Sequence, residues 1–152
     1  MSTRLNLVMQ LVESTQPLMP IAALLGIKLT SVELGQAVLE YDTDQNHANA
    51  MGTLHGGVLC AIADTAMGVA FYTVLEDEES LTTLELKINY LKPVWKGKLT
   101  ASARVVKRGK ITGLVECDIL DEKQQLIARA SSTYMAISGD QAANRMAPQQ
   151  TQ

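Results

Sequence analysis

The chain has 152 residues, of which 47% are hydrophobic and 19% charged, and its formal net charge is −3. This length and apolar content predict one globular domain and exclude a disordered chain, while the negative net charge gives no support to nucleic-acid binding. The two cysteines, Cys60 and Cys117, lack the spacing of a metal site. They favour reduced thiols and a cytoplasmic location over a disulfide framework.

Residues 1–26 are expected to form an N-terminal helical segment with two short helices, near residues 5–13 and 17–24, that ends at Gly26. Polar residues interrupt the apolar run of the first helix, which is typical of an amphipathic helix and not of a signal peptide. Two strands joined by a turn at Gly35 are predicted next.

The longest apolar stretch, residues 56–75, predicts one buried helix. A membrane span is rejected because the stretch contains Asp64 and lacks basic flanks. Asp64 is the only charged residue between His55 and Leu75. A lone buried carboxylate is costly, so it should be partnered, protonated or functional; an Asp satisfied by hydroxyls or backbone is the plain alternative. Cys60, in the same helix, is expected to be an inert core thiol.

Four more strands follow, and the short turns between them predict antiparallel neighbours. In residues 83–90 apolar and polar side chains alternate with period two, which predicts one buried face. Six strands and one long apolar helix predict an α+β fold over residues 27–137, in which a curled antiparallel sheet wraps around the helix. The polar tail, residues 138–152, is expected to be disordered.

Gly56 and Gly57 open the predicted helix. The first N–H groups of a helix have no intrahelical partner, and the helix dipole is positive at this end. Because Gly56 has no side chain, a ligand oxygen can approach its backbone closely, which makes this end a candidate oxyanion site. The alternative is that the two glycines only form a tight turn.

Asp64 lies eight residues beyond Gly56, which corresponds to about 12 Å of helix axis. This separation is too large for the Gly56 amide and the Asp64 carboxylate to act on one carbonyl. Either the two residues are unrelated, or Gly56 of one chain and Asp64 of another form one site across a two-fold axis. Catalysis therefore predicts an obligate dimer.

Four polar side chains near these positions are weaker candidates. His55 positions a substrate carbonyl or holds the loop before the helix, and Asn49 donates to a carbonyl or shapes its own loop. Thr83 holds a water beside Asp64 or faces solvent. His47 is expected to be exposed in a polar loop.

Basic residues are concentrated in residues 87–110, where eight lysines and arginines occur without one acid. Such a segment in an acidic protein indicates an anionic ligand, and Arg108 and Lys110 flank a turn at Gly109 where they can meet phosphates. The alternative is a solvated set of strand ends. No phosphate loop, dinucleotide fingerprint or metal-site spacing occurs in the chain.

With these residues in place, the chain resembles the hotdog-fold acyl-CoA thioesterases of the PaaI-like branch, in the 4-hydroxybenzoyl-CoA thioesterase superfamily. The resemblance rests on NAMGTLHGG at residues 49–57, on Asp64, and on TTLELKINYLKPVWKGKL at residues 82–99. It covers roughly residues 27–137. It implies a hotdog fold, a homodimer that is often a homotetramer (a dimer of dimers), and hydrolysis of a thioester to a free acid and coenzyme A.

The resemblance also implies roles for individual residues. The Gly56 amide polarises the thioester carbonyl, which His55 and Asn49 position, and Asp64 of the partner subunit activates water or attacks directly. Thr83 matches a family hydroxyl residue that orients the water. The candidate substrate-binding residues are Gly57, Arg108 and Lys110, with the last two expected at the nucleotide phosphates.

Coenzyme A is part of the substrate, so no cofactor and no metal are expected, and neither nucleic acid nor a membrane is an expected partner. The acyl group stays open. Two rival interpretations also stay open: a hotdog-fold hydratase or dehydratase, and a non-catalytic acyl-CoA-binding module.

Overall fold

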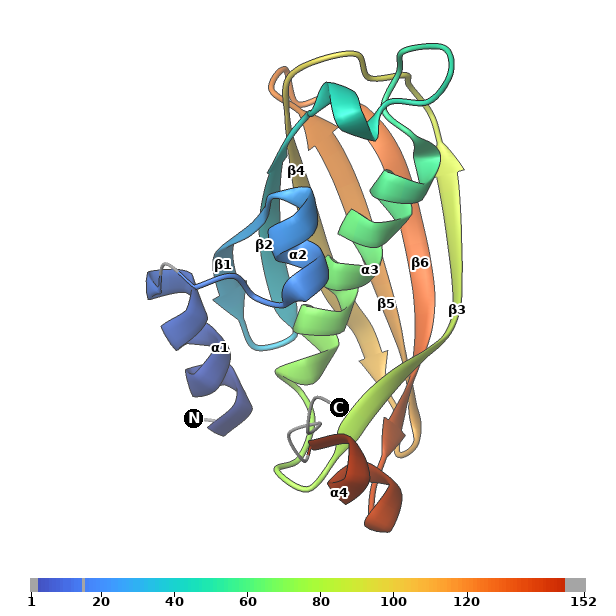
Figure 1. Cartoon of the computed structure of the whole chain (residues 1–152). Helices are drawn as coiled ribbons and strands as arrows, with labels where there is room; N and C mark the ends of the chain where they lie inside the picture. Colours follow the sequence, from blue (N-terminus) through green and yellow to red (C-terminus); the bar gives the residue numbers. More distant parts are fainter. Residues whose placement is uncertain (1–2, 15, 147–152) are drawn as a thin grey trace.

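The computed structural model describes residues 3–14 and 16–146, and its centre is one six-stranded antiparallel sheet (Figure 1). Neighbouring strands follow the order β1-β2-β4-β5-β6-β3 across the sheet. The predicted strands are all present. Their bounds are β1 Ile27–Glu33, β2 Gln36–Asp42, β3 Ser80–Tyr90, β4 Lys98–Arg108, β5 Thr112–Asp121 and β6 Leu126–Ile137.

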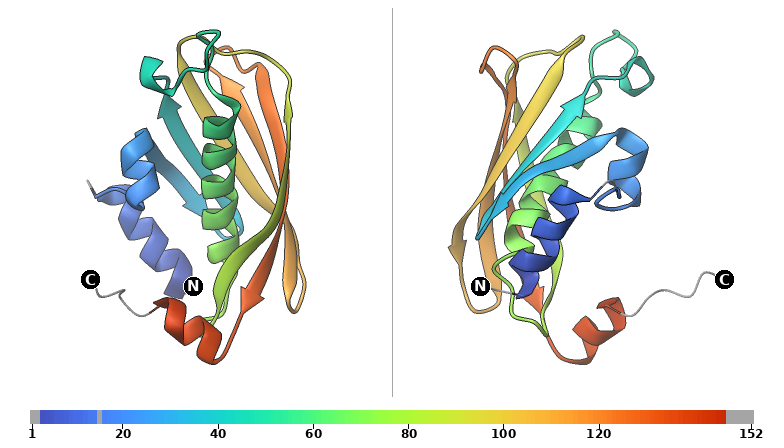
Figure 2. Two further views of the ribbon diagram at one scale, coloured as in Figure 1. Left: turned by 45° about the vertical axis from the view of Figure 1, so that its right-hand side comes forward. Right: turned by 90° about the vertical axis from the view of Figure 1, so that its left-hand side faces the viewer.

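The long helix α3, Gly56–Tyr72, runs along the concave face of this sheet (Figures 1 and 2). Nine of its 17 residues are buried. They pack on inward-facing side chains of the strands, including Leu39 of β2, Ala101 of β4 and Val115 of β5. The predicted curled sheet around one apolar helix is therefore confirmed.

One prediction about strand neighbours is wrong. The short loop between β3 and β4 suggests that these strands pair, but β3 pairs with β6, and β4 lies between β2 and β5. The loop instead carries the chain across the end of the sheet, where the Leu54 amide donates to the Val94 carbonyl at 2.7 Å. As a result β3 forms one edge of the sheet.

Two helices precede the sheet, α1 at Thr3–Glu13 and α2 at Pro20–Leu25. Both lie next to β1, and α1 also contacts α3 (Figure 2). Gly26 ends α2 in the left-handed conformation, with φ of 74°. Arg4 anchors α1, because its guanidinium donates to the carbonyls of Asp77 at 2.6 Å and Glu79 at 2.7 Å in the turn after α3.

The C-terminal segment differs from the expected disordered tail. Residues 140–146 form helix α4, Asp140–Met146, while residues 147–152 lie outside the described part of the chain. Ala142 is fully buried, and the Arg145 guanidinium donates to the Leu81 carbonyl at 3.1 Å. These contacts with the body of the protein explain the helix. None of the described helices is long and apolar enough to cross a membrane.

Candidate active site

Asp64 lies in the middle of α3 with two hydroxyl partners. Its Oδ1 accepts a 2.8 Å hydrogen bond from Tyr134 and a 3.0 Å hydrogen bond from Thr83. No hydrogen bond to Oδ2 is found within the described residues. The side chain is half-buried, not fully buried as the sequence suggests. One oxygen is thus held in place, while the other is free to accept a proton or to attack a carbonyl.

The sheet register brings the two hydroxyls together. Thr83 of β3 lies opposite Tyr134 of β6, and the register shifts immediately afterwards, so that Leu84 is left without a cross-strand partner. Bulges of this kind re-aim side chains and are frequent beside active sites. Here the bulge leaves Leu84 52% exposed while Thr83 reaches Asp64.

Tyr134 is only 1% exposed, and its ring stacks on Phe71 of α3 at 5.4 Å between centroids. Burial raises the pKa of Tyr134 well above its usual range, and the charge of Asp64 and the hydrogen bond to it act in the same direction. A raised phenol pKa means that Tyr134 keeps its proton at every physiological pH. It is therefore a permanent hydrogen-bond donor to Asp64.

The N-terminus of α3 presents a different set of groups. His55 is the N-cap residue, and its Nδ1 accepts a 2.9 Å hydrogen bond from the Gly57 amide. An accepting Nδ1 places the proton of the neutral imidazole on Nε2, so the exposed ring edge is a donor. The Gly57 amide is satisfied by this cap. The Gly56 amide has no acceptor among the described residues, which leaves it available to a ligand oxygen.

Tyr90 of β3 packs against this helix end. Its hydroxyl donates to the Gly56 carbonyl at 3.0 Å and lies 3.1 Å from Cys60 Sγ. The hydrogen bond with Cys60, together with burial, raises the pKa of Tyr90 to about 12. A Cβ on Gly56 would stand 2.9 Å from Tyr90 Cζ, so a side chain at this position would displace the Tyr90 ring. Cys60 is half-exposed, which corrects its prediction as a core thiol.

Asn49 shapes the loop that leads into α3. Its Oδ1 accepts from the amides of Met51 at 2.9 Å and Thr53 at 3.3 Å, and its Nδ2 donates to Thr53 Oγ1 at 2.8 Å. Of its two predicted roles, the loop-shaping one is present in the single chain. His47 is half-buried, since its Nδ1 lies 2.7 Å from the Tyr41 hydroxyl, and is not exposed as predicted.

Much of the basic segment is neutralised by acids on neighbouring elements. Nη2 of Arg108 donates to both carboxylate oxygens of Glu79, at 2.9 Å and 2.8 Å, and the Arg108 guanidinium lies over the Phe71 ring. Lys110 is exposed and has no ion-pair partner within the described residues. Phe71 belongs to the last turn of α3, so Arg108 lies at the end of the helix opposite Gly56. The other ion pairs found for the basic segment within the described residues are Lys92–Asp121, Lys98–Glu40 and Arg104–Glu116.

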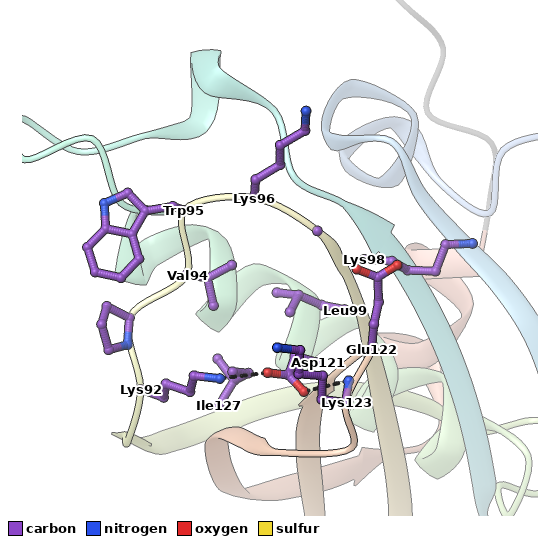
Figure 3. Close-up of a pocket in the computed structure, with 12 residues that line it drawn as sticks. Lys92, Val94, Trp95, Lys96, Lys98, Leu99, Asp121, Glu122, Lys123 and Ile127 are labelled. Carbon is purple, nitrogen blue, oxygen red and sulfur yellow. Dashed lines mark hydrogen bonds and ion pairs between the residues drawn. The ribbon is translucent and has the colours of Figure 1, made fainter.

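A hollow of about 370 Å³ beside the β3–β4 loop contains none of the predicted site residues (Figure 3). Figure 3 shows Lys92 paired with Asp121, while Lys96 points away from the acids and the Trp95 ring lies at the margin of the group. Its residues Lys92, Pro93 and Val94 also line a neighbouring hollow that contains Gly56.

Comparison with known proteins identifies the family of this chain. The family model described as the thioesterase superfamily matches residues 51–128, just over half of the chain. The chain belongs to the thioesterase superfamily. A relative from Listeria monocytogenes, named 1,4-dihydroxy-2-naphthoyl-CoA hydrolase, is 32% identical over 109 residues, which cover 72% of this chain and 89% of the relative.

Two further similar proteins match a larger share of this thioesterase-superfamily chain than the Listeria relative does. The medium/long-chain acyl-CoA thioesterase YigI of Escherichia coli is 28% identical over 132 residues, covering 77% of this chain and 85% of YigI. The structure of PaaI from the phenylacetic acid degradation operon of Escherichia coli matches with a TM-score of 0.79 at 27% identity, covering 90% of this chain and 98% of PaaI. The predicted hotdog fold and thioester hydrolase class are confirmed.

Two residues of this thioesterase-superfamily site were not predicted from sequence. Tyr134 touches Asp64, and Tyr90 touches Gly56, yet both partners are distant in the chain. The available signal for Tyr134 was its place in an alternating strand, since a buried tyrosine hydroxyl needs a partner. Tyr90 offers no comparable signal: the residue is 53% exposed, and an exposed hydroxyl can bond to water instead of to the protein.

Proposed function

We propose that this protein hydrolyses an acyl-CoA thioester to a free acid and coenzyme A, in a homodimer whose two sites are each shared between chains. We call the groups around Asp64 and the groups around Gly56 the two half-sites. The observation that carries the proposal is that one edge strand, β3, contacts both half-sites. Thr83 of β3 contacts Asp64, and Tyr90 of the same strand contacts Gly56.

The exposed edge of β3 supports the dimer. An 11-residue strand at a sheet edge presents unpaired backbone groups that invite a second strand. If β3 pairs antiparallel with β3 of a second copy about its middle, the Tyr90 end of one strand lies beside the Thr83 end of the other. The same two-fold axis brings Gly56 of one chain toward Asp64 of its partner. The separation of about 12 Å within one chain is then no obstacle.

The chemistry follows from the groups at each half-site. The free Gly56 amide at the helix N-terminus stabilises the oxyanion that develops on the thioester carbonyl, and the Nε2–H of His55 positions that carbonyl. Asp64 of the partner subunit accepts a proton from a water as its oxygen attacks the carbonyl carbon. The C–S bond then breaks, and the proton passes to the departing sulfur, which yields the acid and the coenzyme A thiol.

Asp64 also has the geometry of a nucleophile, because its Oδ2 is uncommitted among the described residues. Direct attack would form a mixed anhydride that water then hydrolyses. A single turnover in H₂¹⁸O tests for the anhydride. Direct attack of water on the thioester places ¹⁸O in the product acid and none in Asp64. Hydrolysis of the anhydride at the aspartyl carbonyl instead places ¹⁸O in the Asp64 carboxylate, and the product acid leaves with an unlabelled oxygen from Asp64.

The proposed reaction needs no cofactor, since coenzyme A arrives with the substrate. We propose the dimer as the catalytic unit, with the homotetramer as a dimer of such dimers. The nucleotide phosphates are proposed to lie at exposed basic residues, of which Lys110 is available and Arg108 is engaged by Glu79.

The test of catalysis is thiol release from acyl-CoA esters, followed with a thiol reagent. The wild-type protein is expected to release coenzyme A, and Asp64→Asn to lose at least about a hundredfold in kcat. Hydration of an enoyl-CoA without thiol release would identify a hydratase. Tight acyl-CoA binding without any turnover would identify a binding module.

The test of site sharing is subunit mixing. Asp64→Asn and Gly56→Val homodimers are each expected to be inactive, whereas randomly exchanged subunits recover about one quarter of wild-type activity, because each mixed dimer regains one of two sites. Proven subunit exchange without recovered activity would show that Gly56 and Asp64 act within one chain or not at all.

A further inference from the structure

We infer that a groove between the N-terminal helices and α3 binds the acyl chain of the substrate and selects a linear aliphatic chain of medium length. This inference rests on the proposed function. The groove has a volume of about 460 Å³ and is lined by residues of α1, α2, α3, β3 and β6. Its size is that of an ordinary small-molecule site.

The groove is continuous with the catalytic cluster. Asp64, Thr83 and Tyr134 all line it, so an acyl group attached to a carbonyl at Asp64 has this groove as its neighbour. A larger hollow of about 770 Å³ between the N-terminal helices and β1 contains none of these three residues. Proximity to the reacting carbonyl, and not size, therefore selects the acyl site.

The direction and depth of the groove follow from α3. The helix contributes Asp64, Thr65, Gly68, Val69 and Tyr72, which lie on one face with helical spacing. From Asp64 to Tyr72 the floor runs along about 12 Å of helix axis, roughly the extended length of an eight- to ten-carbon chain.

Two residues on this face set the shape of the groove. Gly68, without a side chain, leaves the floor open. At the far end the Tyr72 hydroxyl is bound by Arg4, whose guanidinium also lies 4.6 Å from the centre of the Tyr72 ring. Because Arg4 fixes Tyr72, the depth of the groove is set before substrate arrives.

The walls favour methylene groups over polar or bulky aromatic groups. Of the 14 described lining residues only Asp64 is charged. The walls opposite α3 are aliphatic, with Leu7 and Leu11 from α1 and Ile21 from α2. Burial of one methylene against such a surface is expected to raise kcat/KM about fourfold.

The selecting walls come from a part of the chain outside the family match. The matched region begins at residue 51, whereas α1 and α2 end at Glu13 and Leu25. Leu7 is 48% exposed and Ile21 is 44% exposed, so large apolar surfaces face the groove rather than the core. Exposed apolar surface that lines a concave site is typical of ligand binding.

The experiment compares kcat/KM for straight-chain acyl-CoA esters from two to twelve carbons, with benzoyl-CoA as an aromatic reference. For the wild-type protein kcat/KM is expected to rise about fourfold per methylene and to level off near eight to ten carbons. In Ile21→Trp, the indole fills the groove. The kcat/KM for octanoyl-CoA is therefore expected to fall at least about tenfold, while kcat/KM for acetyl-CoA stays within about twofold of the wild-type value.

Leu24→Trp is the matched control, because Leu24 lies on the same helix, is 75% exposed and does not line the groove. Its chain-length profile is expected to match that of the wild type. Leu7→Trp repeats the test from α1 if Ile21→Trp proves unstable in thermal melting.

The outcomes separate this inference from the proposed function. No thiol release by the wild type from any ester would overturn the proposed function itself. Turnover with unchanged chain-length profiles in both groove variants would overturn only the groove. A wild-type preference for benzoyl-CoA over octanoyl-CoA would overturn the selection of linear chains.

Discussion

The hydroxyl of Tyr134 donates a 2.8 Å hydrogen bond to Oδ1 of Asp64 and also lies 3.0 Å from the carbonyl oxygen of the same residue. The contact joins β6, the last strand in the chain, to the middle of α3. It holds the carboxylate through Oδ1, and Oδ2 accepts no hydrogen bond from the described residues. Removing the hydroxyl while keeping the ring therefore tests how much the proposed reaction depends on that contact.

Tyr134→Phe is expected to reduce kcat about 10- to 100-fold with little change in KM, because a hydrogen bond to a charged group contributes about 1.5–3 kcal/mol. The fold should persist, since phenylalanine keeps the stacking on Phe71. Tyr41→Phe is the control: it also removes a buried hydroxyl, one that contacts His47, and kcat should be unchanged. Equal losses in both variants would indicate a general effect of stability.

Thr83 is tested by two substitutions that separate its hydroxyl from its shape. Thr83→Val keeps the branched side chain and is expected to lower kcat about tenfold, because the hydrogen bond to Asp64 is lost. Thr83→Ser keeps the hydroxyl, and its kcat should stay within about threefold of the wild-type value, since the lost methyl is at an exposed site. Steady-state kinetics with one acyl-CoA ester measure both. Wild-type turnover by Thr83→Val would show that the contact has no catalytic role.

Gly56 and Tyr90 are expected to be energetically coupled. A methyl group on Gly56 would force the Tyr90 ring away and break its 3.0 Å hydrogen bond to the Gly56 carbonyl. Gly56→Ala should therefore lower kcat/KM by about tenfold and stability by about 1 kcal/mol.

A double-mutant cycle measures this coupling. Once Tyr90→Ala has removed the ring, adding Gly56→Ala should have little further effect. If the two losses are instead additive, the ring does not explain the need for glycine.

Local sequence patterns were sufficient for most of the fold. The alternating residues and the Gly and Pro turns predict six strands, and the apolar stretch predicts α3, which begins at Gly56 as expected. The neighbours of β3 were not predictable in this way, because its pairing with β6 joins residues as distant as Ser80 and Ile137. Short turns indicate where strands end, but they do not determine which edges meet.

The same distinction applies to the site: local sequence indicates some of its residues, but not the contacts between residues that are distant in the chain. Asp64 and Gly56 are unusual residues in an apolar helix, so composition alone makes them candidates. Tyr134 lies 70 residues from Asp64. The alternation of its strand indicates that a buried tyrosine hydroxyl needs a partner, but not that the partner is Asp64. Arg108 was expected to meet phosphates because its neighbours are basic, yet its acid, Glu79, lies 29 residues earlier in the chain. Partners of this kind become known only once the sheet is assembled.

Arg108 and Lys110 are therefore expected to behave differently, although both flank Gly109. Arg108→Gln breaks a half-buried ion pair and should lower the free energy of unfolding by about 1–2 kcal/mol, as measured by urea denaturation. Lys110→Gln should change stability by less than about 0.5 kcal/mol. If Lys110 meets the nucleotide phosphates, its loss raises KM for coenzyme A esters but not for pantetheine esters, and added salt reduces the difference. A selective rise in KM for coenzyme A esters in Arg108→Gln, with stability unchanged, would show that Arg108 serves phosphates and not the Glu79 pair.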